Sequence, residues 1–314
     1  FQYLIVRFNN MTHISEEKFK KLVKTERTEH FITPFGLVYK TFIDLGYHQK
    51  DCSYFMEHAS EYIVNMRKGC WNEFIPLEKD FTTRMLTYLI DADKVQNMNP
   101  VEAIKDFVLE YPNHIYDLSL SNTQSRRSRA GKEFEAIIEL LLIGADIPSD
   151  SQGAIGKQYF QTHQIGKLVD FVTPSVAEYL ANKRNTMLIS AKTTLRERWQ
   201  EVPEEVNRTG IREMYLATLD EAISGESLRI MYEANIIVVT TKTNKEANYP
   251  TNNMVITFEE MLMIGRETTD KWNNYNYSQQ DKSLLLSHIV NQIEKFSNYD
   301  YVKEYYQKRL DQFE

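Results

Sequence analysis

Three short β-prone runs in the second half of the chain constrain its fold most. They are KLVDFV at residues 167–172, TMLISA at 186–191 and NIIVVTT at 235–241. Each is rich in apolar and β-branched residues, and stretches with helical spacing lie between and after them. Short apolar strands that alternate with helices are typical of an α/β core. The pattern therefore predicts a central mixed sheet flanked by helices.

The N-terminal part of the chain predicts helices instead of strands. From Ser15 to about Asn113, apolar residues recur at helical spacing, and Pro76, Pro100 and Pro112 are the expected breaks. The fold class that we expect is therefore α/β with a helical N-terminal part.

Two further helical patterns complete the expected core, one from about Arg129 to Ile143 and a long one from about Gln280 to Phe313. The chain has no internal repeat and no long flexible linker, which favours one compact unit. We expect an N-terminal extension before Met11 at residues 1–10, a helical part at 11–120 and the α/β core at 121–314.

Composition excludes several classes of protein. No apolar run approaches the ~20 residues that a membrane helix needs. The two cysteines, Cys52 and Cys70, form no CxxC or Cys/His cluster, so we expect neither a disulfide scaffold nor a zinc site, and a reducing cytoplasm fits. A formal net charge of -7 argues against indiscriminate nucleic-acid binding. Basic charge is nevertheless concentrated in SRRSRAGK at 125–132.

Asp170 and Lys192 are the strongest candidates for chemistry. Asp170 lies inside an apolar run, where a carboxylate is costly unless it is paired or binds a metal, and Lys192 ends the next run. On neighbouring strands the two side chains would lie side by side. Glu205, thirteen residues after Lys192, and Glu135, on an earlier helix, are the acids that could join them.

Carboxylates and a lysine in such a group suit phosphodiester hydrolysis with Mg²⁺, because carboxylate oxygens bind this hard cation and a lysine stabilises negative charge. The alternative is a structural ion pair, which is the commoner role of a single buried Asp or Lys.

Two other stretches have residue types that bind nucleic acid. Arg196, Glu197 and Arg198 follow the lysine directly, and Arg and Glu side chains can read G·C pairs in the major groove. A solvated helix start is the commoner role of such a triplet. Arg67 and Trp71, four residues apart, would share one face of a helix. Such a pair is most often a packing or cation–π contact.

Together, VDFVTP at 169–174, SAKTTLRERW at 190–199 and EEVNRTG at 204–210 resemble segments of a known enzyme family. They are similar to the type II restriction endonucleases of the PD-(D/E)XK class, in the SsoII-like branch that cuts CCNGG and is related to EcoRII and the CCGG cutters. The resemblance runs from Met11 to the C-terminus. It implies the restriction-endonuclease-like fold.

The resemblance also implies a role for each candidate. Asp170 and Glu205 would bind Mg²⁺, Lys192 would be the catalytic lysine and Glu135 an additional acidic residue. The wider class carries an acid two residues before the lysine, where this chain has Ser190, so the second ligand would have moved to Glu205. The implied DNA contacts are major-groove reading by Arg196, Glu197 and Arg198, minor-groove support by Gln124, and a flipped-base pocket of Arg67 and Trp71.

The expected protein is then a homodimeric, Mg²⁺-dependent bacterial enzyme of the cytoplasm that cuts double-stranded DNA before the first cytosine of CCNGG and leaves a 5′ overhang. A cytosine methyltransferase would be its functional partner. Three alternatives remain open: a nuclease of the same fold that reads CCGG or a longer flanked site, a non-catalytic DNA-binding regulator, and an acidic helical interaction protein.

Overall fold

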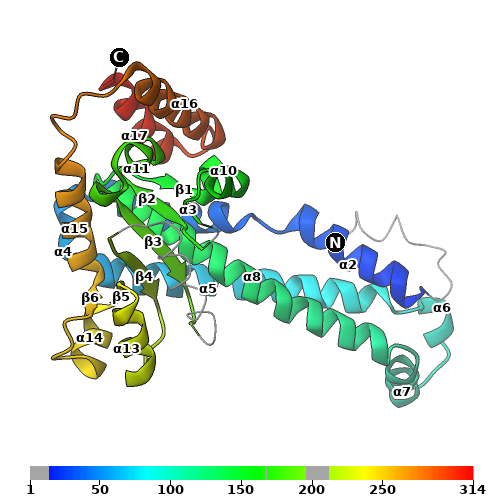
Figure 1. Ribbon diagram of the computed structural model, residues 1–314. Helices are drawn as coiled ribbons and strands as arrows, with labels where there is room; N and C mark the ends of the chain where they lie inside the picture. Colours follow the sequence, from blue (N-terminus) through cyan, green and yellow to red (C-terminus); the bar gives the residue numbers. More distant parts are fainter. Residues whose placement is uncertain (1–13, 167, 196–211, 314) are drawn as a thin grey trace. The chain divides into compact units, whose positions relative to one another are not determined.

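The computed structural model describes residues 14–166, 168–195 and 212–313, shown in Figure 1. These residues form two compact units. Unit 1 comprises the described residues up to Leu37 together with Cys70–Ala130, and unit 2 comprises Val38–Gly69 and the described residues from Gly131 onward. Helices α3 (Pro34–Asp44), α5 (Ala59–Tyr88) and α8 (Pro112–Gly144) contribute residues to both units.

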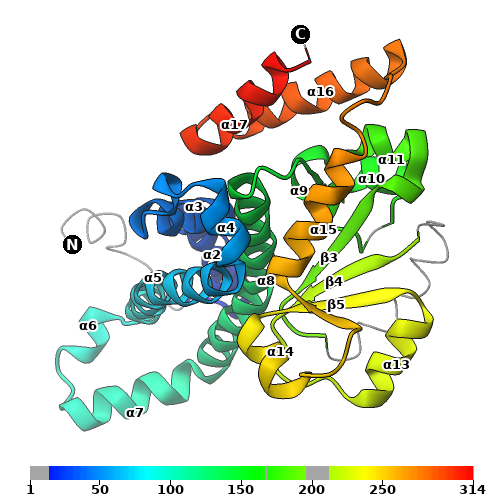
Figure 2. The same cartoon turned by 90° about the vertical axis from the view of Figure 1, so that its left-hand side faces the viewer.

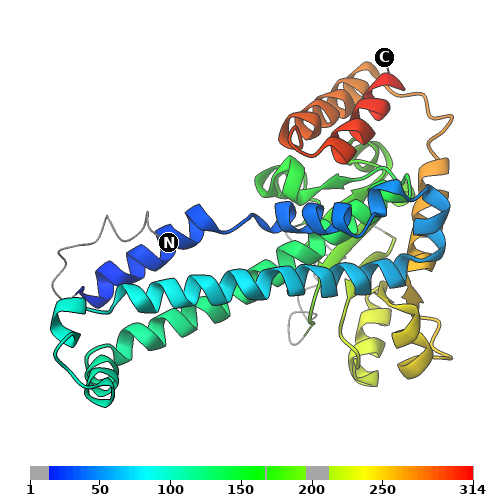
Figure 3. The same cartoon turned by 180° about the vertical axis from the view of Figure 1, so that it is seen from behind.

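Unit 1 is built from helices that pack on one apolar cluster. Figure 3 shows the backbone of these helices, with α2 (Glu16–His30) in blue and the second half of α5 in cyan. Its core includes Phe19 and Val23 from α2, Phe81 and Met85 from α5, and Leu118 from α8. These residues recur three or four positions apart, so each helix buries one face. The helices that belong to unit 1 alone are α2 (Glu16–His30), α6 (Ala92–Val95) and α7 (Pro100–Glu110).

A six-stranded mixed sheet forms the centre of unit 2, with the strand order β1-β2-β3-β4-β5-β6. The first three strands pair antiparallel, and β3 to β6 pair parallel. The strands are β1 (Asp150–Ser151), β2 (Phe171–Thr173), β3 (Met187–Lys192), β4 (Met214–Thr218), β5 (Ile236–Thr240) and β6 (Val255–Thr257). Because β3 to β5 are buried on both faces, they read as continuous apolar runs and not as an alternating pattern.

Helices cover the sheet of unit 2, and Figure 2 shows α13 and α14 beside the parallel strands. Leu188, Leu216 and Val238 pack in one cluster with Leu228 and Met231 of α13. The other helices described in unit 2 are η1 (Tyr47–Gln49), α4 (Cys52–Glu57), α9 (Gln152–Ile155), α10 (Lys157–Thr162), α11 (Val176–Asn182), η2 (Lys183–Asn185), α13 (Gly225–Glu233), α14 (Lys242–Asn248), α15 (Phe258–Asp270), α16 (Gln279–Lys295) and α17 (Asp300–Asp311).

Helix α15 lies against the strand residues that point away from α13. A Cβ atom added at Gly265 would lie 3.3 Å from the Cδ1 atom of Ile147 and 3.9 Å from the Sδ atom of Met187. A larger residue would have to push the Ile147 side chain aside, whereas its distance from Met187 is an ordinary contact. Gly265 therefore allows α15 to approach Ile147 closely.

The expected fold class is confirmed, with corrections in detail. The predicted strands at 186–191 and 235–241 correspond to β3 and β5, whereas the first β-prone run forms only the short β2 at its end. Pro76 lies inside α5 and does not break it. The long pattern at the C-terminus forms two helices, α16 and α17, because the polar Ser297 and Asn298 interrupt it.

Among the residues that the structure describes, no helix is both long enough and apolar enough to cross a lipid bilayer.

A buried carboxylate joins α16 to the sheet of unit 2. Asp150 on β1 accepts hydrogen bonds from the backbone N–H of Val176 at 2.9 Å and from Gln292 Nε2 at 3.0 Å. The Nδ1 atom of His288 lies 3.0 Å from Asp150 Oδ2. All of these groups are buried. Three elements that are distant in sequence therefore depend on one side chain.

Replacing Asp150 with Ala leaves buried polar groups of α11 and α16 without their acceptor. We expect the free energy of unfolding to fall by roughly 3–5 kcal/mol, as when one partner of a buried charged network is removed. Urea denaturation of Asp150→Ala beside the exposed control Asp311→Ala measures this. A loss within about 0.5 kcal/mol of the control, the usual range for surface changes, would contradict this role of Asp150.

Candidate active site

Asp170 and Lys192 form a direct ion pair at one end of β3. Lys192 Nζ lies 2.9 Å from Asp170 Oδ2, and the Ala191 N–H donates to the same oxygen at 2.6 Å. The Asp170 N–H donates to the Ile189 carbonyl at 2.9 Å, next to the antiparallel pair Phe171 and Ile189. The register of β2 against β3 therefore brings the two side chains together, as the sequence predicts.

This pair is largely shielded from solvent, with 10% of the Asp170 side chain and 17% of the Lys192 side chain exposed. Burial raises the pKa of Asp170, and the ammonium of Lys192 and the Ala191 N–H oppose that shift. Removing the lysine would leave a buried carboxylate without its compensating charge.

Glu135 lies close enough to this pair to respond to its charges. Burial raises the pKa of Glu135 to about 7, and the negative charge of Asp170 contributes to the rise, while Lys192 and Lys132 oppose it. Glu135 comes from the part of α8 that belongs to unit 2. The structure thus brings together Asp170, Lys192 and Glu135, three of the four residues predicted for chemistry.

Glu139, one helical turn beyond Glu135, is a carboxylate that the sequence analysis missed. It is buried, it accepts a hydrogen bond from Ser151 Oγ at 2.8 Å, and burial raises its pKa. Its negative charge also contributes to the raised pKa of Glu135. In the sequence, Glu139 stands inside the apolar run IIELLLIG at 137–144, which is the same kind of signal that pointed to Asp170.

The oxygen donors at this site fit a hard divalent cation. Both hydrogen bonds that the described residues donate to the Asp170 carboxylate go to Oδ2, so Oδ1 keeps its lone pairs. Glu135 adds a second carboxylate. Mg²⁺ prefers such oxygen ligands. Ser190, where the wider class carries an acid, is fully buried, and among the described residues no partner is found for its hydroxyl group.

Asp220 anchors the chain just beyond β3. The sequence did not point to this residue. Asp220 Oδ2 accepts a hydrogen bond from the backbone N–H of Leu195 at 2.5 Å, and its own carbonyl accepts one from Asn244 Nδ2 at 3.0 Å. The Leu195 side chain is buried in the core of unit 2. Asp220 follows β4, and finding this contact from the sequence would have required the position of that strand.

The remaining predicted residues are placed separately or not at all. Arg196, Glu197, Arg198 and Glu205 lie outside the described residues. Gln124 is exposed on α8 in unit 1.

Arg67 and Trp71 both lie on α5, as the sequence predicts, but they belong to different units. In unit 2, Arg67 Nη1 lies 3.5 Å from Glu133 Oε2. In unit 1, 44% of Trp71 is exposed, and its ring centroid lies 6.2 Å from that of Phe74.

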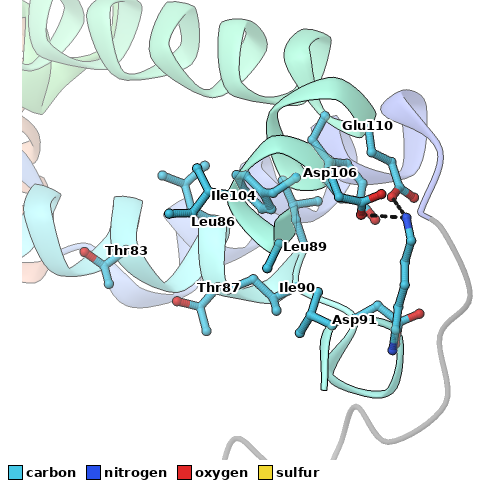
Figure 4. Close-up of a pocket in the computed structure, with 14 residues that line it drawn as sticks. Thr83, Leu86, Thr87, Leu89, Ile90, Asp91, Ile104, Asp106 and Glu110 are labelled. Carbon is cyan, nitrogen blue, oxygen red and sulfur yellow. Dashed lines mark hydrogen bonds and ion pairs between the residues drawn. The ribbon is translucent and has the colours of Figure 1, made fainter. Parts of the chain in front are cut away.

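A mostly apolar hollow of about 500 Å³ lies elsewhere in unit 1, between the end of α5 and α6 and α7 (Figure 4). Leu86, Ile90 and Ile104 are among the residues that line it, and at its rim Lys94 Nζ lies 2.6 Å from Asp106 Oδ2. None of the residues predicted for catalysis or recognition lines this hollow. It is therefore not the candidate active site.

Comparisons with known proteins agree with this geometry. A family model described as the EcoRII C terminal matches residues 94–262. The type II restriction enzyme SsoII of Shigella sonnei is 63% identical over 300 residues, which cover 96% of this chain and 98% of that protein.

Solved structures agree as well. A structure described as metal-depleted Ecl18kI in complex with uncleaved, modified DNA has a TM-score of 0.90 and 62% identity, and the match covers 95% of this chain and 100% of that one. The restriction endonuclease PspGI in its substrate DNA complex has a TM-score of 0.57 and 18% identity, covers 78% of this chain and 95% of that one, and shows the fold alone.

The fold, the site and these matches define the class: the chain is a type II restriction endonuclease, a site-specific deoxyribonuclease. Enzymes of this kind need a divalent metal ion. Within that class, the chain belongs to the family of restriction enzymes that includes SsoII.

The raised pKa of Glu135 predicts a pH-dependent effect on stability. The folded-state pKa of about 7 lies above the ordinary value of 4.5, so the protonated carboxyl favours folding at low pH and this contribution is lost as the pH rises through 7. We therefore expect Glu135→Gln to match the unchanged protein at pH 4 and to be more stable at pH 8, by up to about 3 kcal/mol.

Urea denaturation without divalent metal between pH 4 and 8 measures this difference. The exposed Glu246→Gln serves as the control and should show no such trend. A stability difference for Glu135→Gln that stays constant across the range would contradict the raised pKa.

Proposed function

We propose that the chain is a homodimeric, Mg²⁺-dependent endonuclease that recognises CCNGG in double-stranded DNA and cuts before the first cytosine, leaving a 5′ overhang. The observation that carries the catalytic part is the buried pair of Asp170 and Lys192 beside Glu135. The specific site, the metal and the dimer are inferred from the family resemblance together with this geometry.

The catalytic residues divide the work of hydrolysis. Asp170 and Glu205 would hold Mg²⁺, with Glu135 as an additional acidic residue beside them, and the bound ion would polarise the scissile phosphate and lower the pKa of a water molecule. The Lys192 ammonium orients the attacking water and stabilises the negative charge that develops on the phosphate. The bond between phosphorus and the 3′ oxygen breaks, which leaves a 5′ phosphate and a 3′ hydroxyl. The Ala191 N–H keeps the Asp170 carboxylate in place throughout.

Sequence recognition is assigned to Arg196, Glu197 and Arg198. Each arginine can donate two hydrogen bonds to guanine O6 and N7, and a glutamate accepts from the N4 amino group of cytosine. Three successive readers suit two adjacent G·C pairs, and Gln124 supports them from the minor groove. The segment follows Leu195, whose N–H donates a hydrogen bond to Asp220.

Trp71 is the proposed stacking surface for a flipped central base, with Arg67 as the second residue of the pocket. Its exposed indole supports this role. Stacking of a base on an aromatic ring contributes ~1–3 kcal/mol and hardly depends on which base is stacked. The contribution offsets part of the few kcal/mol that flipping costs. Because this stacking does not depend on the base, the central position of the recognition sequence accepts any nucleotide.

The palindromic site supports a dimer, because a two-fold protein presents the same reading surface to each half-site. Each subunit then cuts one strand. A cytosine methyltransferase that modifies CCNGG is the proposed functional partner, since the host carries the same sequence.

Lys192→Ala is expected to abolish cleavage while specific binding survives. Loss of one charge-stabilising group typically slows catalysis by at least about 10²-fold. Cleavage of a DNA pool that contains CCNGG, CCGG and CCWGG, with Mg²⁺ or with EDTA, measures activity, and a gel-shift assay in EDTA measures binding. The exposed Lys271→Ala is the matched control and should cut like the unchanged chain.

Two outcomes would contradict the proposal in different ways. Cutting at CCGG, or only within a longer context, would overturn the CCNGG assignment and retain the nuclease. Unreduced cutting by Lys192→Ala would overturn the catalytic assignment.

Trp71→Ala is expected to weaken binding to CCNGG by about 5- to 100-fold, the equivalent of one lost base stack. On a duplex that lacks the central base, the same substitution should cost less than about threefold, because no base is left to stack. Fluorescence anisotropy with both duplexes measures the difference. Equal losses on the two duplexes would show that the indole supports binding without receiving a base.

A further inference from the structure

A half-exposed arginine borders the indole of Trp71 in unit 1. The guanidinium carbon of Arg126 lies 5.8 Å from the ring centroid, within the range of a cation–π contact. Arg126 comes from the basic segment at 125–132, to which the proposed function assigns no role. A cation beside an exposed aromatic ring is a combination that proteins use to bind nucleotides.

A buried carboxylate holds this arginine in place. Arg126 Nε donates a hydrogen bond to Glu78 Oε2 at 2.7 Å, and Arg126 Nη2 donates to the same oxygen. Only 4% of the Glu78 side chain is exposed, compared with 52% of the Arg126 side chain. Exposed ion pairs rarely fix a side chain, but a buried carboxylate needs a compensating charge. Glu78 therefore fixes the guanidinium on the side of Trp71.

Aromatic contacts restrict the indole as well. Phe74 lies next to Trp71 and also contacts Phe31, with 5.8 Å between their ring centroids. The guanidinium carbon of Arg129 lies 4.9 Å from the Phe74 ring centroid. The Phe74 ring, which contacts Trp71, is thus also packed against Phe31 and Arg129. The indole and the Arg126 guanidinium therefore form a defined pair before any ligand is present.

We propose that Trp71 and Arg126 together bind one nucleotide, with its base stacked on the indole and its phosphate on the guanidinium. This inference rests on the proposed role of Trp71. Two of the five N–H donors of Arg126 are directed at Glu78, and the half-exposed remainder suits phosphate oxygens. Glu78 is a positioning residue. Neither contact reads a base, which agrees with an unspecified central nucleotide.

Neutralising the phosphate tests the contact directly. Binding is measured by fluorescence anisotropy in EDTA with two CCNGG duplexes, one natural and one with methylphosphonates on both sides of the central nucleotide. The proteins are the unchanged chain, Arg126→Ala and the control Arg127→Ala. Arg127 is exposed, adjacent on α8 and equally charged.

If Arg126 binds this phosphate, Arg126→Ala weakens binding to the natural duplex by about 10- to 100-fold, as expected for a charge-assisted hydrogen bond. On the methylphosphonate duplex it costs less than about twofold, because the two changes remove the same interaction. Arg127→Ala should weaken binding to both duplexes by the same factor. Equal losses for Arg126→Ala on both duplexes would overturn the inference.

Arg126→Ala leaves the Glu78 carboxylate buried without this partner and can destabilise unit 1. The double variant Glu78→Gln with Arg126→Gln removes both charges together. Like Arg126→Ala, it should bind the natural and the methylphosphonate duplex with nearly equal affinity.

Failure of the proposed function has a separate readout. If the unchanged chain binds CCNGG no more tightly than a scrambled duplex, or Trp71→Ala loses equally on duplexes with and without the central base, the underlying role of the site fails whatever Arg126 does.

Discussion

The buried carboxylate of Asp170 is the constraint on which the rest of the candidate site depends. A charge in that position is stable only with compensation, and the compensation comes from the adjacent strand, through the Lys192 ammonium and the Ala191 N–H. The pairing requires one register of β2 against β3, because a shift by one residue would turn Lys192 to the other face. Glu135 then lies in the field of this pair, which is why its pKa responds to Asp170.

The two units use different interactions to hold their functional groups. In unit 2, a continuous mixed sheet positions the site, and buried carboxylates such as Asp150 join the sheet to α11 and α16. In unit 1, arginines and aromatic rings contact one another across helices, from Arg129 over Phe74 to the indole of Trp71. The first arrangement suits a site that must hold a metal and a lysine rigidly. The second suits the surface that we propose at Trp71, which would accept a base without reading it.

The sequence predicted much of the site because its main pair depends on local pattern. An acid within one apolar run and a lysine at the end of the next leave few arrangements in a sheet, and the structure has the expected one.

The sequence did not predict β4, because Met, Leu and Ala in MYLAT also favour helices. Pro76 was wrong as a break, since packing of Phe74 and Phe81 on the same helix outweighs the lost backbone hydrogen bond. Asp220 could not be found, because its partner is set by tertiary structure, whereas Glu139 was missed although it stands inside an apolar run. Roles in DNA recognition came from the family resemblance and not from pattern.

The hydrogen bond between Asp220 and the Leu195 N–H bears on how enzymes of this kind diversify. It joins the end of the β3 segment to the chain after β4, and Leu195 itself is buried in the core. Changes downstream of this anchor therefore begin from a backbone that the sheet already stabilises. Under the proposed function, substitutions at Arg196, Glu197 and Arg198 would alter the side chains offered to DNA, whereas the contacts that hold Asp170 and Lys192 come from residues before this anchor. Specificity and chemistry can evolve at different rates on the same scaffold, and an engineer can vary the first while leaving the second intact.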